Sequence, residues 1–254
     1  LYTSNNITNI NNINIGQFPT RKHFQGITDN VDDLNEFTQN CINAQLKINL
    51  SNEIKFFKTH HAYWTNKNNK FTNTDTTLGV IHIVRDPRNI ITSLKNHFNF
   101  NDYNHALNFL LDEKKVISFN NQEIENNLPH IISSWKNHFN SWKKMKKNYL
   151  LIKYENLLFS PEQEFEKIIN YLERIFDRKF DKKKVIDAIE KNNFEKLKEF
   201  EKKNGFIEAP KFSGGSISFF YLGKKNNWKN LLETKISKKI EEEFEKEMKE
   251  LNYI

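Results

Sequence analysis

The stretch from Gly79 to Phe98 constrains the fold of this chain more than any other. It begins with a short apolar run, Val80–Val84, whose β-branched residues are typical of a buried strand in a parallel sheet. Asp86 is a good N-cap and Pro87 suits the first helical position, so a helix is predicted to follow directly. Because ligands of open α/β sheets bind at the carboxyl ends of strands, Arg85 is placed where an anion would be held.

Strands and helices are predicted to alternate along the chain. Helices are expected over residues 31–47, 103–115, 129–147, 161–176 and 234–251, one or two short ones over 181–202, and further strands over 54–58 and 149–154. This alternation indicates parallel β-α-β units. The predicted fold class is therefore α/β with three layers, in which helices cover a central, mostly parallel sheet. No change of composition marks a linker, so residues 1–254 are predicted to form a single domain.

Charge and cysteine content narrow the class of partner and the compartment. The net charge is +7, from 39 basic and 32 acidic residues. This favours nucleotides, sulfated or phosphorylated small molecules, nucleic acids or acidic lipids as partners, although solvated surface lysines explain it equally well. The single cysteine, Cys41, excludes an internal disulfide and fits a reducing compartment. No apolar run is long enough to span a membrane and no secretion signal is visible, so a cytoplasmic location is predicted.

Polar side chains follow three of the predicted strands. They are Lys58–His60, Arg85 and the pair Tyr154-Glu155, which should meet at one edge of a parallel sheet. A histidine there could take a proton from an attacking hydroxyl, while the cations hold an anionic group. On this spacing alone, a purely structural histidine remains the alternative.

Five segments of the chain resemble, in order and spacing, the motifs of the sulfotransferases that use 3′-phosphoadenosine 5′-phosphosulfate (PAPS). They are Phe57–His60, Val84–Ser93, Ser134–Trp142, Ile152–Asn156 and Gly223–Lys229. The resemblance covers most of the chain and implies a P-loop NTPase-like fold. It also implies transfer of a sulfuryl group from PAPS to a hydroxyl or amine of a small-molecule or glycan acceptor, without a metal.

The resemblance also implies a role for each matching residue. His60 would be the general base that deprotonates the acceptor hydroxyl, and Lys58 would lie beside the sulfuryl group. Arg85 and Ser93 would bind the 3′-phosphate of the donor. The positions expected to contact the adenosine are Tyr154, Asn192 and Phe194, and those expected to close over the same phosphate are Gly223, Lys224 and Lys225.

The chain departs from the family pattern at several positions. Tyr221-Leu222 replaces the Arg-Lys pair before the late glycine, a loss that Lys224 and Lys225 could offset. Asn226 stands at the second loop glycine, and asparagine tolerates a positive φ well. The family's late dimerisation motif is not met around Thr234, which leaves a homodimer open.

The family's opening strand and phosphate loop have no counterpart before Lys58. Such a loop cradles the 5′-phosphosulfate with backbone N–H groups and a lysine. The sequence begins at Leu1 rather than at a methionine. The expectation is that the loop precedes Leu1, and the alternative is an inactive relative that naturally lacks it.

Two further classes of function are weaker interpretations. A phosphotransferase on the same fold would need a magnesium-binding carboxylate, and Asp86 is better explained as a helix cap. A nucleic-acid-binding module would show cations clustered with exposed aromatic residues, whereas the aromatic residues here fall on apolar faces. The eight histidines show no metal-ligand spacing, so no metal site is predicted.

Overall fold

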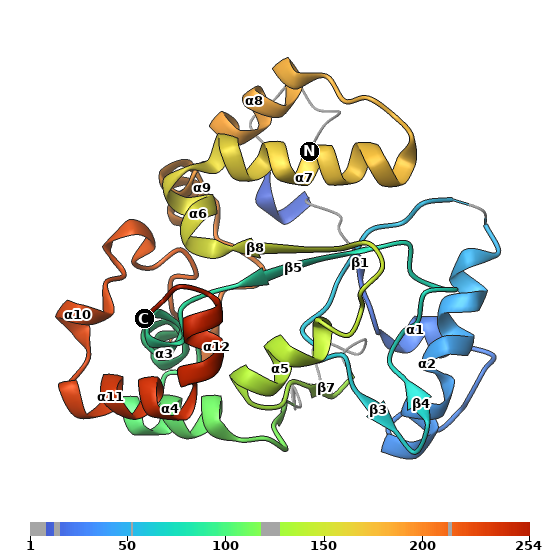
Figure 1. The fold of residues 1–254 in the computed structure, drawn as a ribbon, viewed down its shortest axis with the longest axis horizontal. Helices are drawn as coiled ribbons and strands as arrows, with labels where there is room; N and C mark the ends of the chain where they lie inside the picture. The colour runs from blue at the N-terminus through green and yellow to red at the C-terminus, as the bar shows by residue number, and fades with distance from the viewer. Residues whose placement is uncertain (1–8, 13–15, 52, 118–127, 213–214) are drawn as a thin grey trace. The chain divides into compact units, whose positions relative to one another are not determined.

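The computed structural model of the chain describes residues 9–12, 16–51, 53–117, 128–212 and 215–254. The described residues form two compact units (Figure 1). The first unit comprises residues 81–110 and 150–254 together with the short 3-10 helix η1 (Ile10–Asn12). The second unit comprises the described residues of 14–80 and 111–149.

Apart from the first residue of each strand, the first unit contains the pair β5 (Val80–Val84) and β8 (Tyr149–Lys153), and it contains most of the described helices. Its helices before the late loop are α3 (Pro87–His97), α4 (Tyr103–Leu111), α6 (Tyr154–Phe159), α7 (Pro161–Phe176), α8 (Lys182–Lys191) and α9 (Phe194–Asn204). The short antiparallel pair β9 (Lys211–Phe212) and β10 (Gly215–Ser216) follows. The chain then forms η2 (Gly223–Lys225), α10 (Trp228–Leu231), α11 (Thr234–Glu243) and α12 (Glu245–Glu250).

Strands β5 and β8 run parallel. At their beginnings the Val80 N–H donates to the Asn148 carbonyl over 2.8 Å. Just past their ends the Asp86 N–H donates to Glu155 Oε1 over 2.9 Å. The two strands therefore begin side by side and end side by side, as parallel strands do. This confirms the predicted α/β class with parallel strands.

The predicted strand–turn–helix from Gly79 to Phe98 is also confirmed. Asp86 caps α3 by accepting the Arg88 N–H at 2.9 Å, and Pro87 is the first helical residue. Helices α10 and α11 contact α3, and α11 contacts α12 (Figure 1). The single helix predicted over 234–251 is interrupted at Phe244, whose φ is −119°. Its apolar face nevertheless stays buried, at Ile236, Ile240, Phe244, Met248 and Leu251.

The described residues of the second unit form three short strand pairs and three helices. The parallel pair is β1 (Gly16–Gln17) with β2 (Phe57–Lys58), and the antiparallel pairs are β3 (Thr65–Asn66) with β4 (Asn69–Lys70) and β6 (Val116–Ile117) with β7 (His130–Ile131). The helices are α1 (Arg21–Phe24), α2 (Leu34–Asn49) and α5 (Trp135–Trp142).

The helix predicted over residues 129–147 is wrong in its first part. His130–Ile131 is strand β7, and the helix begins only at Trp135. Ser133 has a positive φ of 63°, which an α-helix does not admit, and the Ser134 side chain caps α5. The apolar spacing alone extended the prediction across a break that two serines impose.

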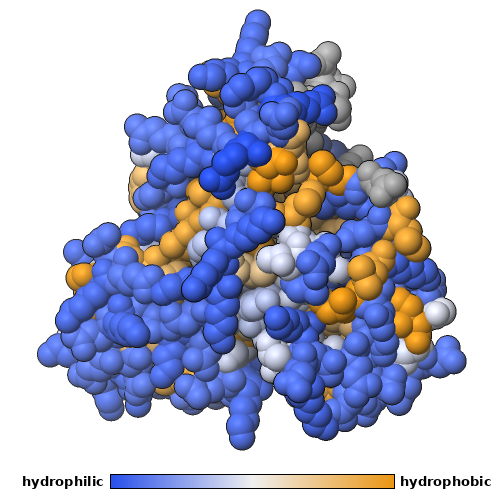
Figure 2. All heavy atoms as spheres, turned by 45° about the vertical axis from the view of Figure 1, so that its right-hand side comes forward, coloured by the Kyte–Doolittle hydropathy of each residue, from blue (hydrophilic) through white to orange (hydrophobic). Residues whose placement is uncertain are grey.

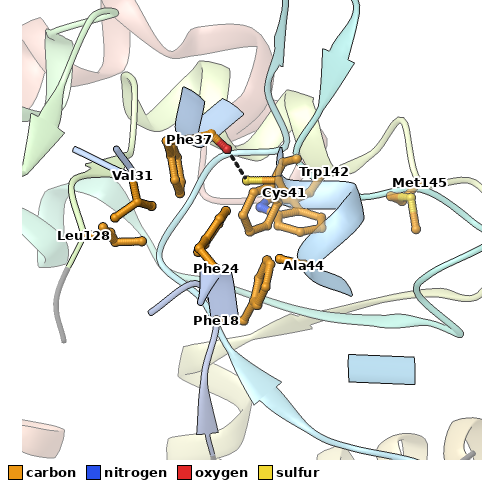
Figure 3. Close-up of a cluster of buried hydrophobic side chains, with 10 residues drawn as sticks. Phe18, Phe24, Val31, Phe37, Cys41, Ala44, Leu128, Trp142 and Met145 are labelled. Atoms are coloured by element: carbon orange, nitrogen blue, oxygen red, sulfur yellow. Dashed lines mark hydrogen bonds between the residues drawn. The ribbon is translucent and has the colours of Figure 1, made fainter. Parts of the chain in front are cut away.

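A cluster of aromatic and small apolar side chains forms the core of the second unit (Figure 3). Its members include Phe18, Phe24, Phe37, Ala44, Phe71, Trp142 and Met145. Cys41 lies in this core, and its Sγ donates to the Phe37 carbonyl at 3.4 Å. Burial raises the pKa of the Cys41 thiol, so this residue packs as a small apolar side chain rather than as a nucleophile.

Among the described residues, no helix is both long and apolar enough to cross a membrane. The face drawn in Figure 2 is mostly hydrophilic, with several apolar patches between charged side chains. The most exposed apolar residues include Leu50, Ile207 and Phe159. Exposed apolar side chains of this kind are common on protein surfaces and do not by themselves identify a partner.

Candidate functional site

The first unit contains a cationic site where β5 and β8 end. Arg85 follows β5, and its Nη1 donates to Ser93 Oγ, two turns into α3, at 3.0 Å. The same guanidinium lies over the ring of Tyr154, 4.4 Å from its centroid. Burial lowers the pKa of Arg85, opposed by Tyr154 and Glu155, but arginine stays protonated near neutral pH. The site is therefore a held positive charge at the place predicted for an anion.

Asn226 supplies a second donor to Ser93. Its Nδ2 donates to the Asn89 carbonyl at 3.0 Å, which fixes the amide orientation because a carbonyl can only accept. The same Nδ2 lies 3.3 Å from Ser93 Oγ, while Thr92 Oγ1 donates to Asn226 Oδ1 at 2.6 Å. The φ of Asn226 is −73°, so the tolerance of asparagine for a positive φ is not used here. The hydrogen bonds of the Asn226 side chain, rather than an unusual backbone conformation, are the structural reason for an asparagine at this position.

These contacts occupy the acceptor positions of the Ser93 hydroxyl. A hydroxyl oxygen has two lone pairs, and here Arg85 and Asn226 each donate to it. The Ser93 O–H can then donate to a bound group. A cation beside a hydroxyl donor suits a phosphate better than a neutral ligand.

A closed ring of hydrogen bonds holds the residues directly after Arg85 and Tyr154. Glu155 accepts the Asp86 N–H at 2.9 Å and the Tyr253 hydroxyl at 3.0 Å. Arg88 donates to the Tyr253 carbonyl at 2.8 Å and to Asp86 Oδ2 at 2.7 Å, and thereby completes the ring. Burial, and then the neighbouring Glu155, raise the pKa of the Tyr253 hydroxyl, so it remains a donor.

The expected adenosine positions lie at the junction of α8 and α9. Asn192 ends α8 and donates from Nδ2 to the Ala188 carbonyl at 2.7 Å, while its buried Oδ1 has no partner among the described residues. Phe194 begins α9, and its ring lies against Gly223. A Cβ at Gly223 would be 2.4 Å from Phe194 Cε1, and the φ of Gly223 is +54°. Glycine is therefore required at this turn.

The two loop lysines project outward from the same turn. Lys224 and Lys225 belong to η2 and are exposed. Lys224 Nζ lies 5.9 Å from the ring centroid of Phe159. Their expected contribution to phosphate binding stays a prediction.

Lys58 and His60 belong to the second unit. Lys58 ends β2 in register with Gln17 of β1, and its carbonyl accepts the Phe18 N–H at 3.1 Å. His60 lies two residues further on and is exposed, whereas the adjacent His61 is fully buried. The local chain thus directs only the first of the two histidines toward solvent.

Side chains of α5 hold the backbone at both histidines. His138 Nε2 donates to the His60 carbonyl at 3.3 Å, and Trp142 Nε1 donates to the His61 carbonyl at 2.9 Å. Strand β7 adds a further bond, because the Ala62 N–H donates to the Ile131 carbonyl at 2.9 Å. His60 therefore projects from a non-helical segment whose backbone is fixed from two elements.

The rings beside His60 are uncharged near neutral pH. His130 lies 5.7 Å from His60 between ring centroids and stacks on His61 at 5.0 Å. Burial lowers the pKa of His130 and of His138 to about 4, and that of His61 well below its usual value. A proton taken up by His60 would therefore not face a second imidazolium. The amide of Gln17 lies 2.9 Å from His130 Nε2 and holds this ring.

The structure thus brings Arg85, Ser93 and Tyr154 into contact in one unit, and packs Phe194 on Gly223 within the same unit. Lys58 and His60 lie together in the other unit. Within the described residues, no group of histidine, cysteine or acidic side chains has the arrangement of a metal site. Sequence reasoning missed the roles of Tyr253 and Asn226, whose partners are distant along the chain.

The fold and this arrangement define an α/β protein with a partly buried cation at adjacent strand ends. The profile of the sulfotransferase domain family matches residues 6–252. The chain therefore belongs to the sulfotransferase domain family. One curated relative, sulfotransferase 2A1 of Macaca fascicularis, is 26% identical over 175 residues, which are 68% of this chain and 57% of that protein.

Two solved structures share the fold. Retinol dehydratase in complex with androsterone and the inactive cofactor PAP superposes with a TM-score of 0.54 at 18% identity, over 78% of this chain and 54% of that one. Mouse sulfotransferase SULT7A1 complexed with PAP gives a TM-score of 0.52 at 17% identity, over 79% and 68%. The chain thus spans little more than half the length of the macaque enzyme and of retinol dehydratase.

Proposed function

We propose that this chain carries out sulfuryl transfer from PAPS to a hydroxyl or amine acceptor. The observation that carries the proposal is the contact of Arg85 with Ser93 and Tyr154 at the ends of β5 and β8. This site presents a held cation and a hydroxyl donor, which together suit the 3′-phosphate of the donor nucleotide. Membership of the sulfotransferase family supports the same assignment.

The adenosine positions also fit such a nucleotide. Buried polar atoms in proteins nearly always have a hydrogen-bond partner, and Asn192 Oδ1 has none among the described residues. An acceptor of this kind suits an amino group of a bound base. Phe194 offers an aromatic ring two residues away, held against Gly223. We assign Asn192, Phe194 and Tyr154 to the nucleoside, and Gly223, Lys224 and Lys225 to the same phosphate.

His60 is the proposed general base and Lys58 its cationic neighbour. His60 takes the proton of the acceptor hydroxyl while the oxygen forms a bond to sulfur. The bond between sulfur and the 5′-phosphate oxygen breaks, and adenosine 3′,5′-bisphosphate (PAP) leaves. Lys58 stabilises the negative charge that moves onto the departing oxygen. The exposure of His60 and the neutral rings around it support its role as base.

The remaining features are proposed with the function. The acceptor is a small molecule or a glycan rather than a nucleic acid, and the reaction needs no metal. Residues 1–254 act as one domain. A homodimer of this chain would form through a surface other than the unmatched motif near Thr234. A cytoplasmic location is supported by the single, buried cysteine. A screen of phenols, glycans and lipids with PAPS would identify the acceptor class.

Calorimetric titration of the natural full-length protein with PAP tests the proposal. Adenosine 5′-monophosphate (AMP), which lacks the 3′-phosphate, is the comparison ligand. We expect PAP to bind at least about 10-fold more tightly than AMP, because a charged hydrogen bond to phosphate contributes about 1.5–3 kcal/mol. Equal affinity for the two nucleotides would contradict the proposal. A phosphotransferase is disfavoured, since the Asp86 carboxylate is held by Arg88.

A further inference from the structure

Helix α9 carries three residues on one face that hold the segment before the phosphate turn. Phe194, Lys198 and Glu201 follow the helical spacing i, i+4, i+7, and we call them the α9 face. Residues 218–223, the return segment, run along this face into η2. Each member of the α9 face contacts a different part of the return segment.

Glu201 makes the most extensive of these contacts. Its carboxylate is buried and accepts from Ser218 Oγ at 2.8 Å, the Phe219 N–H at 2.6 Å and the Phe220 N–H at 3.0 Å. Burying a carboxylate is costly unless its oxygens are hydrogen-bonded, and here three consecutive residues supply the donors. In the sequence Glu201 looks like one more surface acid in a lysine-rich helix, so only the structure reveals it.

The other two contacts continue toward the turn. Lys198 Nζ donates to the Tyr221 carbonyl at 2.7 Å. The Phe194 ring then meets Gly223, the first residue of η2. Three residues later, Asn226 donates to Ser93 Oγ. The return segment is thus held to α9 along its length and leads directly to the donor of the phosphate site.

We propose that Glu201 is a positioning residue for nucleotide binding, which sets the return segment so that residues 223–226 meet the phosphate held by Arg85 and Ser93. The inference rests on the proposed function. A displaced return segment would move Asn226 away from Ser93 and weaken the hold on the 3′-phosphate. The nucleoside and the 5′-phosphate would be affected less, because Glu201 contacts neither Tyr154 nor Asn192.

The test compares the affinities of PAP and AMP in matched variants of the full-length protein. Glu201→Gln replaces one of the two acceptor oxygens by an NH2 group, which cannot accept from the return segment. Glu199→Gln, an exposed position on the same helix, is the control for the loss of charge. We expect the ratio of Kd for AMP to Kd for PAP to fall about 10-fold in Glu201→Gln and to stay unchanged in Glu199→Gln.

A purely structural role would lower the bound fraction for both nucleotides and leave that ratio intact, and this outcome overturns the proposal. Ser218→Ala removes one of the three donors and serves if Glu201→Gln folds poorly; its ratio should fall about 3-fold. An unchanged ratio in Ser218→Ala and Glu201→Gln would also overturn the proposal. A wild-type protein that does not prefer PAP would overturn the proposed function itself, and the role of Glu201 with it.

Discussion

Replacing Gly223 by alanine should destabilise the protein more than any other glycine substitution at a comparable φ. The φ of Gly223 is +54°, and a left-handed backbone costs an L-residue about 1–2 kcal/mol. The new Cβ would also lie 2.4, 2.6 and 2.7 Å from three atoms of the Phe194 ring. Forcing such an overlap typically costs about 1–3 kcal/mol more. The total expected loss is about 2–5 kcal/mol.

Gly26→Ala separates the two contributions. Gly26 has a φ of +71°, but the nearest atom to an added Cβ there is the flexible Lys47 Nζ, at 3.9 Å. This variant should lose only the backbone contribution of about 1–2 kcal/mol. Urea denaturation followed by tryptophan fluorescence measures both variants under the same conditions, with the m-value as a check for unchanged denatured states.

A double-mutant cycle with Phe194→Ala identifies the contact. In the Gly223→Ala background, removing the ring should restore about 1–3 kcal/mol relative to its effect in the wild-type protein. If Gly223→Ala and Gly26→Ala agree within about 0.5 kcal/mol, the packing of Phe194 on Gly223 is not what requires glycine. A coupling energy near zero in the cycle would refute the same reasoning.

Three further predictions concern Arg85, His60 and His130. Arg85→Lys should weaken PAP binding by about 10- to 100-fold in calorimetry, because lysine cannot both donate to Ser93 and stack on Tyr154; an unchanged affinity would remove Arg85 from the phosphate site. His60→Asn should reduce turnover by about 100- to 10,000-fold and leave the Kd for PAP unchanged, and full turnover would disprove the base. The buried ring of His130 has a pKa lowered to about 4, below that of the unfolded chain, so it contributes stability above about pH 6.5 that is lost as the pH falls toward 4. The urea midpoint of the wild-type protein should fall as the pH is lowered through that range, and the midpoint of His130→Asn should fall less. Equal pH dependence of the midpoint in the two proteins would contradict the lowered pKa of His130.

Local sequence signals were sufficient where one short segment determines its own structure. The strand before Arg85 and the helix after Asp86 follow from β-branched residues, a cap and Pro87. All of these signals lie within a few residues of each other, so no distant partner is needed to read them. Arg85 and Ser93 lie eight residues apart, and the strand end and the first two turns of the helix bring their side chains into contact.

The sequence failed where a distant partner overrides a local pattern. The apolar spacing near His130 is helical, but pairing with Val116–Ile117 makes this stretch a strand. Glu201 and Asn226 carry no local signal, because their partners lie 17–19 and 133–137 residues away. A charged helix residue and a loop asparagine are typical of surfaces, and only tertiary contacts distinguish these two.

The hydrogen-bond ring that includes Tyr253 holds the residues that directly follow Arg85 and Tyr154. The Arg85 guanidinium lies over the Tyr154 ring, while in the next two residues the Asp86 N–H donates to the Glu155 carboxylate. Glu155 reaches Tyr253, 98 residues further along the chain. In the proposed function, Arg85 and Tyr154 bind the nucleotide, and the residue that follows each of them holds the backbone by hydrogen bonds. The C-terminal segment thus helps to fix the two backbone positions from which Arg85 and Tyr154 project.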